Sequence, residues 1–274
     1  MISFSIIIPV YNILESNSLQ YFDRLIYSIY CNLKIDFVRS CFKEVIIIND
    51  NPDQSVEKEV SDILNKYHVD KYKIYTNHKN CGQAFSRNRG ASFAIGDYLH
   101  FIDQDDFVSD CFYERILLRL SNHKEKVIIS KLNLFYSDSS DYFDPYRKLT
   151  LKLYNNSKSI NDLKIMMLSN IANSPGGYLI ERKLFLDIGG YVNLNNYGTD
   201  DWGIFYKLIC QGDISLSFCK DAIFYYRIHP NQNIKKLNMK ASLREQFLLI
   251  RKMNKICGLY YYMLYFFKLN FLGR

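Results

Sequence analysis

The 274-residue sequence has little of what marks fibrous, linker-rich or disulfide-stapled proteins. It contains 12 glycines and 5 prolines, which excludes a collagen-like chain and long flexible linkers. The seven cysteines form no CxxC pair and their number is odd. We therefore expect free thiols in a reducing compartment rather than a disulfide framework or a zinc site. Hydrophobic residues make up 48% of the chain, which is enough for a substantial core.

A secretion signal and a long hydrophobic run are also missing. The first residues, MISFSIIIPVYN, have no basic segment ahead of the apolar run and no small-residue cleavage site. The longest apolar run without a charge, residues 256–267, is shorter than the ~20 residues of a membrane-spanning helix. These absences predict a cytoplasmic protein.

Positive charge is concentrated at the C-terminus. The net charge is +7, yet the segment from Lys235 to Arg274 holds nine basic residues and one acidic residue, so the rest is near neutral. A basic stretch followed by the aromatic-rich run 259–267 predicts helices that lie on the inner face of the cell membrane, as in a peripheral protein. The alternative is that they pack on the rest of the chain or on a second copy, as a homodimer. Nucleic-acid binding is not expected, because the remainder has no basic stripe.

Short apolar runs alternate with helical patterns through the first 120 residues. We expect strands at residues 3–10, 44–48, 73–76 and 97–102, and helices at 19–33, 55–67, 84–94 and 111–120. Ser55 is the expected cap of the second helix. Continuous apolar strands separated by helices predict an α/β fold with a mostly parallel sheet covered on both faces. Such sheets bind ligands at the carboxyl ends of their strands.

The second half of the chain is less regular. Residues 136–159 are rich in Ser, Asp, Asn and Tyr and predict an irregular connection, which is often a loop over a site. A helical segment near residues 165–171, a helix at 202–211 and a strand at 222–226 are expected to follow.

Three carboxylates follow the fourth expected strand. Asp103, Asp105 and Asp106 lie within four residues and repel one another unless a positive group sits among them. Carboxylate oxygens suit a hard divalent cation such as Mg²⁺ or Mn²⁺. The alternative is that Asp105 or Asp106 caps the helix that follows.

Polar and aromatic residues also follow the first two strands. Asp50, in the segment Asn49-Asp50-Asn51-Pro52, is suited to accept hydrogen bonds from a base or ribose, or to form an Asx turn. Tyr11 is suited to stack on a flat ring, or to pack on the neighbouring helix.

Six segments in a fixed order carry a family resemblance. They are SIIIPVYN, IIINDN, NCGQAFSRNRG, GDYLHFIDQDD, GGY followed by TDDWGIFYKL, and YRIH. Together they resemble the family 2 glycosyltransferases of the bacterial polysaccharide type, which adopt the GT-A fold. The resemblance covers about residues 3–230. It implies a glycosyltransferase domain at 1–230, with a nucleotide-binding half at 1–106 and an acceptor half at 107–230, and a basic, aromatic helical tail at 231–274.

The resemblance implies an inverting transfer from a nucleotide-diphospho-sugar, with a UDP-sugar favoured, to a hydroxyl of a glycan. The cofactor implied is Mn²⁺ or Mg²⁺, and the expected acceptor is a lipid-linked O-antigen or capsule intermediate. The implied nucleotide-binding residues are Pro9, Tyr11, Asn12, Asp50, Arg87 and Asp103. The implied metal ligands are Asp105 and His229, the implied base is Asp201, and Asp106, Gly176, Gly177, Asp200, Trp202 and Arg227 are expected near the diphosphate, donor or acceptor.

Each role has a structural alternative. His229 and Trp202 would otherwise be packing residues, and Asp200 or Asp201 would cap a helix. One carboxylate must face the acceptor hydroxyl to take its proton, while the carboxylates after the fourth strand serve the metal. Two other functions fit a similar sheet. A sugar-phosphate nucleotidyltransferase would need a glycine-rich loop after the first strand, which is absent, and an inactive nucleotide-sugar-binding scaffold would not need all of Asp103, Asp105 and Asp201.

Overall fold

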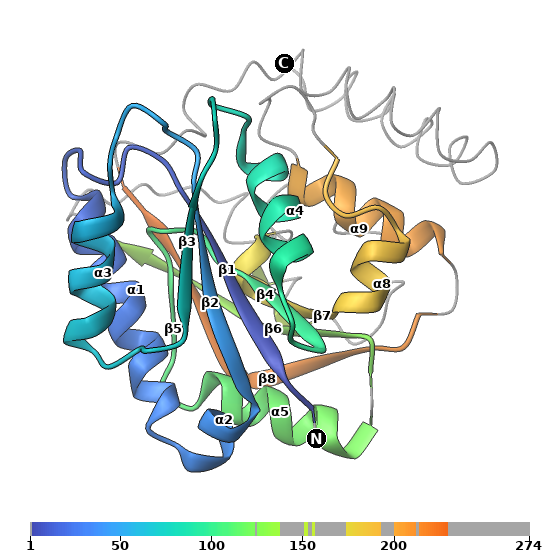
Figure 1. Cartoon of the computed structure of the whole chain (residues 1–274). Helices are drawn as coiled ribbons and strands as arrows, with labels where there is room; N and C mark the ends of the chain where they lie inside the picture. Colours follow the sequence, from blue (N-terminus) through green and yellow to red (C-terminus); the bar gives the residue numbers. More distant parts are fainter. Residues whose placement is uncertain are drawn as a thin grey trace.

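The computed structural model describes residues 2–123, 125–137, 151–152, 155–156, 174–192, 200–211 and 214–229. Within these residues the strands form one eight-stranded mixed sheet in the order β3-β2-β1-β4-β7-β6-β8-β5, flanked by helices (Figure 1). The predicted irregular connection at 136–159 lies mostly outside the described residues, and within it the described residues 151–152 and 155–156 are helical. The predicted helical segment at 165–171 and the tail at 231–274 lie wholly outside them.

The first half of the chain builds the parallel part of the sheet. Strands β1 (Phe4–Val10), β2 (Phe42–Asn49), β3 (Tyr72–Thr76) and β4 (Tyr98–Phe101) run parallel to one another. All seven residues of β1 are buried, as expected for a strand covered on both faces. These four strands confirm the α/β interpretation of the sequence.

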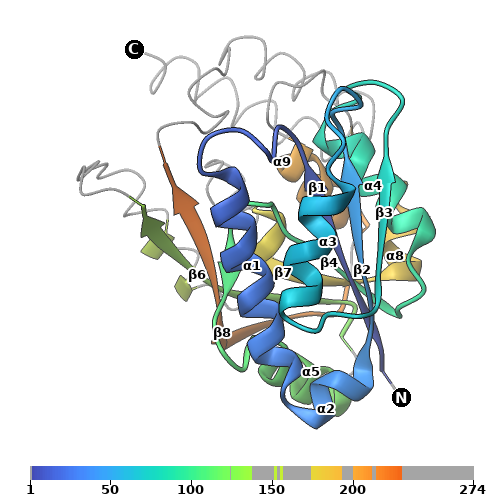
Figure 2. The same cartoon turned by 60° about the vertical axis from the view of Figure 1, so that its left-hand side comes forward.

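Helices cover both faces of this parallel part. Helix α1 (Ser18–Leu33) and helix α3 (Glu57–Lys66) lie together on one side, and α4 (Gln83–Phe93) lies on the other (Figures 1 and 2). A short helix, α2 (Asp36–Cys41), leads into β2. The prediction that Ser55 caps α3 is wrong. The helix begins at Glu57, and the Ser55 hydroxyl instead donates to the Glu57 carboxylate at 3.0 Å.

The second half of the chain adds antiparallel strands. β7 (Tyr178–Glu181) pairs antiparallel with β4, and β6 (Val127–Tyr136) pairs antiparallel with β7. β8 (Leu216–Ile228) runs parallel to β6, and the two-residue β5 (Phe107–Val108) pairs antiparallel with β8. The sheet is therefore mixed, with four parallel pairs out of seven in the described residues.

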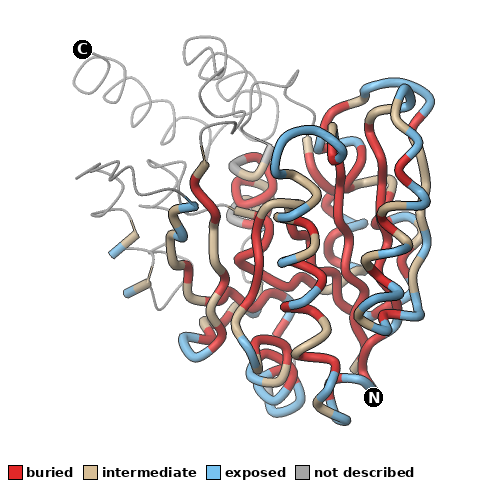
Figure 3. Tube along the Cα trace, turned by 90° about the vertical axis from the view of Figure 1, so that its left-hand side faces the viewer, coloured by how far each residue is buried: buried red, intermediate tan, exposed pale blue. Residues whose placement is uncertain are grey.

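Three further helices complete the described fold. They are α5 (Phe112–His123), α8 (Arg182–Asp187) and α9 (Asp200–Cys210), and a 3-10 turn, η2 (Pro175–Gly177), precedes β7. The central strands are buried along their length and the surrounding helices expose one side (Figure 3). Among the described residues, no helix has the length and apolarity that a membrane crossing requires. The six described cysteines are free thiols.

Candidate active site

The carboxyl ends of three parallel strands meet at one edge of the sheet. Val10 at the end of β1 pairs in register with Asn49 at the end of β2, and Phe101 at the end of β4 pairs with Ile7. Pro9 lies beyond the part of β1 that pairs with β4, so its missing N–H breaks no hydrogen bond of that pair. The loops that follow the three strands carry most of the predicted site residues.

The loop after β1 is tied to the loops after β4 and β2 by side-chain amides. The Tyr11 N–H donates to Gln104 Oε1 at 2.9 Å, and Gln104 Nε2 donates back to the Tyr11 carbonyl at 3.1 Å. Asn12 adopts a left-handed backbone conformation (φ 50°), and its side-chain oxygen accepts a hydrogen bond from Asn51 Nδ2 at 2.8 Å. Tyr11 is 42% exposed, so it is accessible to a ligand.

Asp50 is the anchor of the segment that enters α4. Its carboxylate is buried and accepts hydrogen bonds from Asn77 Nδ2 (2.7 Å) and from the N–H groups of Cys81 (2.9 Å) and Gly82 (2.7 Å). The Asx turn considered for Asp50 is instead formed by Asn49, whose Oδ1 accepts the N–H of Asn51 at 3.0 Å. The contact of Asp50 with a base stays a prediction.

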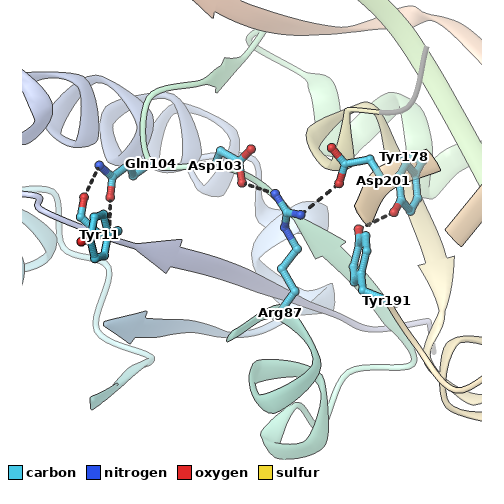
Figure 4. A network of polar contacts seen from close by, with 7 residues as sticks. All are labelled: Tyr11, Arg87, Asp103, Gln104, Tyr178, Tyr191 and Asp201. Atoms are coloured by element: carbon cyan, nitrogen blue, oxygen red, sulfur yellow. Dashed lines mark hydrogen bonds and ion pairs between the residues drawn. The ribbon is translucent and has the colours of Figure 1, made fainter. Parts of the chain in front are cut away.

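Arg87 joins two carboxylates that are far apart in the sequence. Its guanidinium donates to Asp103 Oδ1 at 2.7 Å and to Asp201 Oδ1 at 2.9 Å (Figure 4). The Arg87 side chain is 1% exposed, while those of Asp103 and Asp201 are 19% and 30% exposed. The predicted nucleotide residue and the predicted base therefore share one buried cation, which sequence reasoning had assigned to the nucleotide and its phosphates.

Electrostatics explain why Arg87 is tolerated in the interior. Burial disfavours the charged guanidinium, but Asp103 and Asp201 outweigh it and hold the pKa of Arg87 well above its usual range. The guanidinium also lies 5.1 Å from the centre of the Tyr191 ring. The hydroxyl groups of Tyr191 and Tyr178 form a hydrogen bond with each other (Figure 4). The charged centre is thus walled by a pair of buried tyrosines.

A second cluster forms where β8 ends. His229 Nε2 lies 2.9 Å from Asp105 Oδ2, so the two predicted metal ligands are brought together although 124 positions separate them. The His229 ring also contacts the Tyr21 ring of α1, with 5.0 Å between their centres. This packing fits a structural histidine whose ring nitrogen has a hydrogen-bond partner. It also fits a pair of side chains that can bind a metal ion.

Asp106 and Arg227 hold this cluster in place. Asp106 is fully buried, and its Oδ1 accepts the Arg227 N–H at 2.9 Å, while Arg227 Nε donates to the Asp105 carbonyl at 2.6 Å. The Arg227 guanidinium lies 4.4 Å from the centre of the Tyr21 ring and also packs on Phe107. Burial and the neighbouring carboxylates of Asp105 and Asp103 raise the pKa of Asp106 well above its usual range. The alternative that Asp105 or Asp106 caps α5 is wrong, because α5 begins only at Phe112 and the two carboxylates contact His229 and Arg227 instead.

The donors at Asp105 and His229 fit a divalent cation. A carboxylate oxygen suits Mg²⁺ or Mn²⁺ and an imidazole nitrogen is a common metal ligand, and here the two side-chain atoms hydrogen-bond to each other at 2.9 Å. Within the described residues, no group of three or more His, Cys, Asp or Glu side chains is placed to hold a metal. A cation bound here would take its remaining ligands from water and from a substrate, which is the way Mg²⁺ is usually held.

The two glycines of η2 are packed against the core. A Cβ on Gly176 would collide with the Phe224 ring, which gives this glycine a packing reason. The Gly176 carbonyl accepts a hydrogen bond from His100 Nε2 at 3.0 Å, and the Gly177 carbonyl accepts one from Ser130 Oγ at 3.1 Å. Their predicted approach to a donor sugar stays a prediction.

Two predicted residues and three unpredicted ones complete the site. Asp200 and Trp202 belong to the first turn of α9 beside Asp201, but the predictions for their side chains lie outside what the structure describes. Sequence reasoning missed the positioning contacts of Gln104, Asn88 and His100. Gln104 and Asn88 stand inside motifs that were quoted for their neighbours, and nothing in the sequence marks their partners.

Comparison with known proteins identifies a family and several relatives. The family model described as "Glycosyltransferase like family 2" matches residues 5–270. The minor teichoic acid biosynthesis protein GgaB of Bacillus subtilis (strain 168) is 30% identical over 138 residues, which is 49% of this chain and 14% of GgaB. The chain therefore corresponds to a small part of that relative.

Solved structures share the fold at low sequence identity. S. aureus TarS 1-349, solved in complex with UDP-GlcNAc, matches with a TM-score of 0.73 and 16% identity over 98% of this chain and 73% of TarS 1-349. GalNAc-T7, solved with UDP, GalNAc and Mn²⁺, matches with a TM-score of 0.61 and 17% identity over 92% of this chain and 48% of its own.

Proposed function

The chain belongs to the family 2 glycosyltransferases and has the GT-A fold predicted from its sequence, and from this premise we propose that it is an inverting, divalent-metal-dependent sugar transferase. Its donor is a UDP-sugar and its acceptor a hydroxyl of a glycan. The observation that carries the proposal is the Arg87 bridge, because it holds the nucleotide-side Asp103 and the base Asp201 at one point of the sheet edge.

The donor nucleotide binds along the ends of β1, β2 and β4. The exposed ring of Tyr11 stacks on the base, and Asp50 keeps the neighbouring segment in place. Asp103 accepts from the ribose hydroxyls, and the buried guanidinium of Arg87 holds its carboxylate in place. The complex of TarS 1-349 with UDP-GlcNAc supports a UDP-sugar as the donor.

Asp105 and His229 hold the cation, and Asp106 and Arg227 orient them from behind. When bound, Mn²⁺ or Mg²⁺ supplies Lewis-acid stabilisation of the departing nucleoside diphosphate. The Mn²⁺ found with UDP in GalNAc-T7 supports this choice of metal. The chain's own contribution is to present one carboxylate and one imidazole next to each other.

Asp201 is the base of a single displacement. The acceptor oxygen attacks the anomeric carbon, the bond from that carbon to the diphosphate oxygen breaks, and the hydroxyl proton passes to the Asp201 carboxylate. The contact with Arg87 fixes this carboxylate, and its 30% exposure leaves it accessible to an acceptor. Inversion follows because the nucleophile enters opposite the leaving group.

The acceptor is a lipid-linked glycan at the inner face of the cell membrane, such as an O-antigen or capsule intermediate. The resemblance to GgaB, a minor teichoic acid biosynthesis protein, supports a bacterial surface polymer. The basic and aromatic residues after 234 have the composition of a segment that binds a membrane surface.

Two substitutions test the division of labour. Asp201→Asn is expected to keep Mn²⁺-dependent UDP binding, measured by calorimetry. Its rate of UDP release from the nucleotide-sugar donor during transfer should fall by a factor of about 10² or more. Asp105→Ala is expected to lose the Mn²⁺-dependent part of UDP binding. The donor for this assay is found by thermal-shift screening of nucleotide sugars with and without Mn²⁺, because the best ligand stabilises most.

Two results would count against the proposal. Full turnover by Asp201→Asn would remove Asp201 as the base. UDP binding without turnover by the wild-type chain, across all nucleotide sugars and with lipid-linked acceptors, would support the inactive scaffold instead.

A further inference from the structure

We infer that Lys207 is a positioning residue, which sets the place of α9, and with it Asp201, by binding the loop Gly189-Gly190-Tyr191 that α4 holds from the other side. The catalytic consequence rests on the proposed role of Asp201. The geometric part stands without it.

The loop begins with the C-terminal cap of helix α8. Gly189 donates to the Leu186 carbonyl at 3.0 Å and Gly190 donates to the Phe185 carbonyl at 2.9 Å, which is the Schellman pattern of a helix C-terminus. Both glycines have left-handed backbones, with φ of 72° and 57°. The turn is therefore rigid, and its two carbonyl groups are left to be satisfied by other elements.

Asn88 on α4 grips the loop from one side. Its Oδ1 accepts the Tyr191 N–H at 2.8 Å and its Nδ2 donates to the Tyr191 carbonyl at 2.9 Å. A Cβ on Gly190 would collide with the same Asn88 side chain, so the loop and α4 are in close contact. The preceding residue on α4 is Arg87, whose guanidinium faces the Tyr191 ring.

Lys207 on α9 grips the loop from the other side. Its ammonium donates to the Gly189 carbonyl at 3.0 Å and to the Gly190 carbonyl at 2.6 Å. Lys207 is half-buried, and burial lowers its pKa below the usual value. A cation at the C-terminus of α8 is also favoured by the helix dipole.

These contacts attach α9 to α4 at two separate points. One is direct, from Asp201 to Arg87, and the other runs from Lys207 through the loop to Asn88. Six residues separate Asp201 from Lys207, so the points lie on different turns of α9 and together fix its direction as well as its distance. Loss of the second point lets α9 pivot about the first. Misplacement of a catalytic group by about 1 Å costs about 10²-fold in rate.

The test uses Trp202, the only tryptophan of the chain, as a reporter next to Asp201. In Lys207→Met and in Asn88→Ala we expect a shifted emission maximum of Trp202. We also expect about tenfold or greater loss of kcat for UDP release from UDP-GlcNAc, or from the donor that screening finds, while the dissociation constant for UDP with Mn²⁺ stays within about twofold. Lys207→Arg keeps a cation in reach of the carbonyls and should restore both signals in part.

The matched control is Lys183→Met. Lys183 is an exposed lysine of α8 that pairs with Asp187 at 2.6 Å and does not contact the loop carbonyls in the described structure. It should leave the emission and kcat unchanged. If Lys207→Met loses its folded circular dichroism, Asn88→Asp decides, because it keeps the acceptor for the Tyr191 N–H and replaces the donor to the Tyr191 carbonyl with a negatively charged oxygen that repels it.

Unchanged Trp202 emission and unchanged kcat in the folded variants at Lys207 and Asn88 would overturn the inference. A wild-type chain that neither binds UDP nor releases it would instead defeat the proposed function. The fluorescence readout needs no turnover, so it would still decide on the positioning role.

Discussion

The side-chain amide of Gln104 and the main chain of Tyr11 form a closed pair of hydrogen bonds, 2.9 Å and 3.1 Å long. Gln104 stands between Asp103 and Asp105, so the residue that separates the two carboxylates also fixes the loop after β1 (Figure 4). The loops after β1 and β4, which carry the residues proposed to contact the nucleotide base, the ribose and the metal, are therefore joined to each other rather than independent.

Removal of this amide should weaken donor binding without slowing the chemical step. For Gln104→Ala we expect the dissociation constant for UDP with Mn²⁺, and KM for the donor, to rise about fivefold or more, since a lost hydrogen bond costs about 1 kcal/mol. The value of kcat should change little, because Asp201 is not touched. Calorimetry and initial rates measure this, with the exposed Gln20→Ala of α1 as control. A fall in kcat with unchanged KM would contradict the assignment.

Removal of the metal should show how much the Asp105–His229 pair contributes to UDP binding. With EDTA present we expect UDP to lose most of its effect on the melting temperature, and added Mn²⁺ to restore it, because ligand binding stabilises the folded chain by mass action. His229→Ala should reduce the Mn²⁺-dependent part and leave the melting temperature of the ligand-free protein nearly unchanged. Equal UDP stabilisation with and without EDTA would refute metal-assisted binding.

His100 predicts a specific acid sensitivity. The Gly176 carbonyl can only accept, so Nε2 carries the proton of the neutral ring and Nδ1 accepts from the Tyr113 hydroxyl at 2.8 Å. Burial lowers the pKa of His100 to about 4, against about 6.5 in an unfolded chain. The unfolded state therefore binds more protons between pH 6.5 and 4, and stability falls as the pH falls through this window, by about 3 kcal/mol for this residue.

Urea unfolding at pH 7 and at pH 4.5 measures the effect. His100→Gln should be less stable than the wild type at pH 7, and the gap should shrink towards acid pH because glutamine does not titrate. The exposed His78→Gln should follow the wild-type pH dependence. A gap that stays constant with pH would mean that His100 does not titrate as its burial requires.

The basic, aromatic tail predicts membrane recovery. Deletion of the residues after Lys255 should move the protein from the membrane fraction to the soluble fraction, because it removes the run 259–267 of aromatic and aliphatic residues. Sedimentation with vesicles of anionic lipids, against neutral vesicles as control, measures the shift. Unchanged recovery on anionic vesicles would favour packing of the tail on the chain or on a second copy.

The parallel half of the sheet could be predicted from the sequence because its strands are buried on both faces. Runs such as Ile6–Ile8 and Val45–Ile48 have no polar residue to alternate with, and each is followed by a helical pattern. The other half gave a weaker signal, since only part of β8 was predicted, at residues 222–226. β5 has two residues, β7 has four, and β7 pairs with β4, a strand about 80 positions earlier in the chain.

The members of the site were easier to predict than their contacts. Family motifs placed Asp105 and His229 at one edge, and the structure brings them together. Sequence could not show that Arg87 binds a carboxylate 114 positions away, because that contact depends on how α9 packs. It also could not show that the glycine at 176 is required by the Phe224 ring, since Phe224 belongs to β8 and follows Gly176 by 48 positions.

The long separation between Asp105 and His229 has a consequence for synthesis of the protein. When a ribosome has synthesised only the parallel half, the nascent chain contains Tyr11, Asp50, Arg87 and Asp103. It lacks His229 and strand β8, whose main chain binds the Asp106 carboxylate. Such a nascent chain would contain the proposed nucleotide-binding residues but would lack the proposed cation site until β8 has docked. Truncated translation products would then be unable to consume nucleotide sugars in the cell.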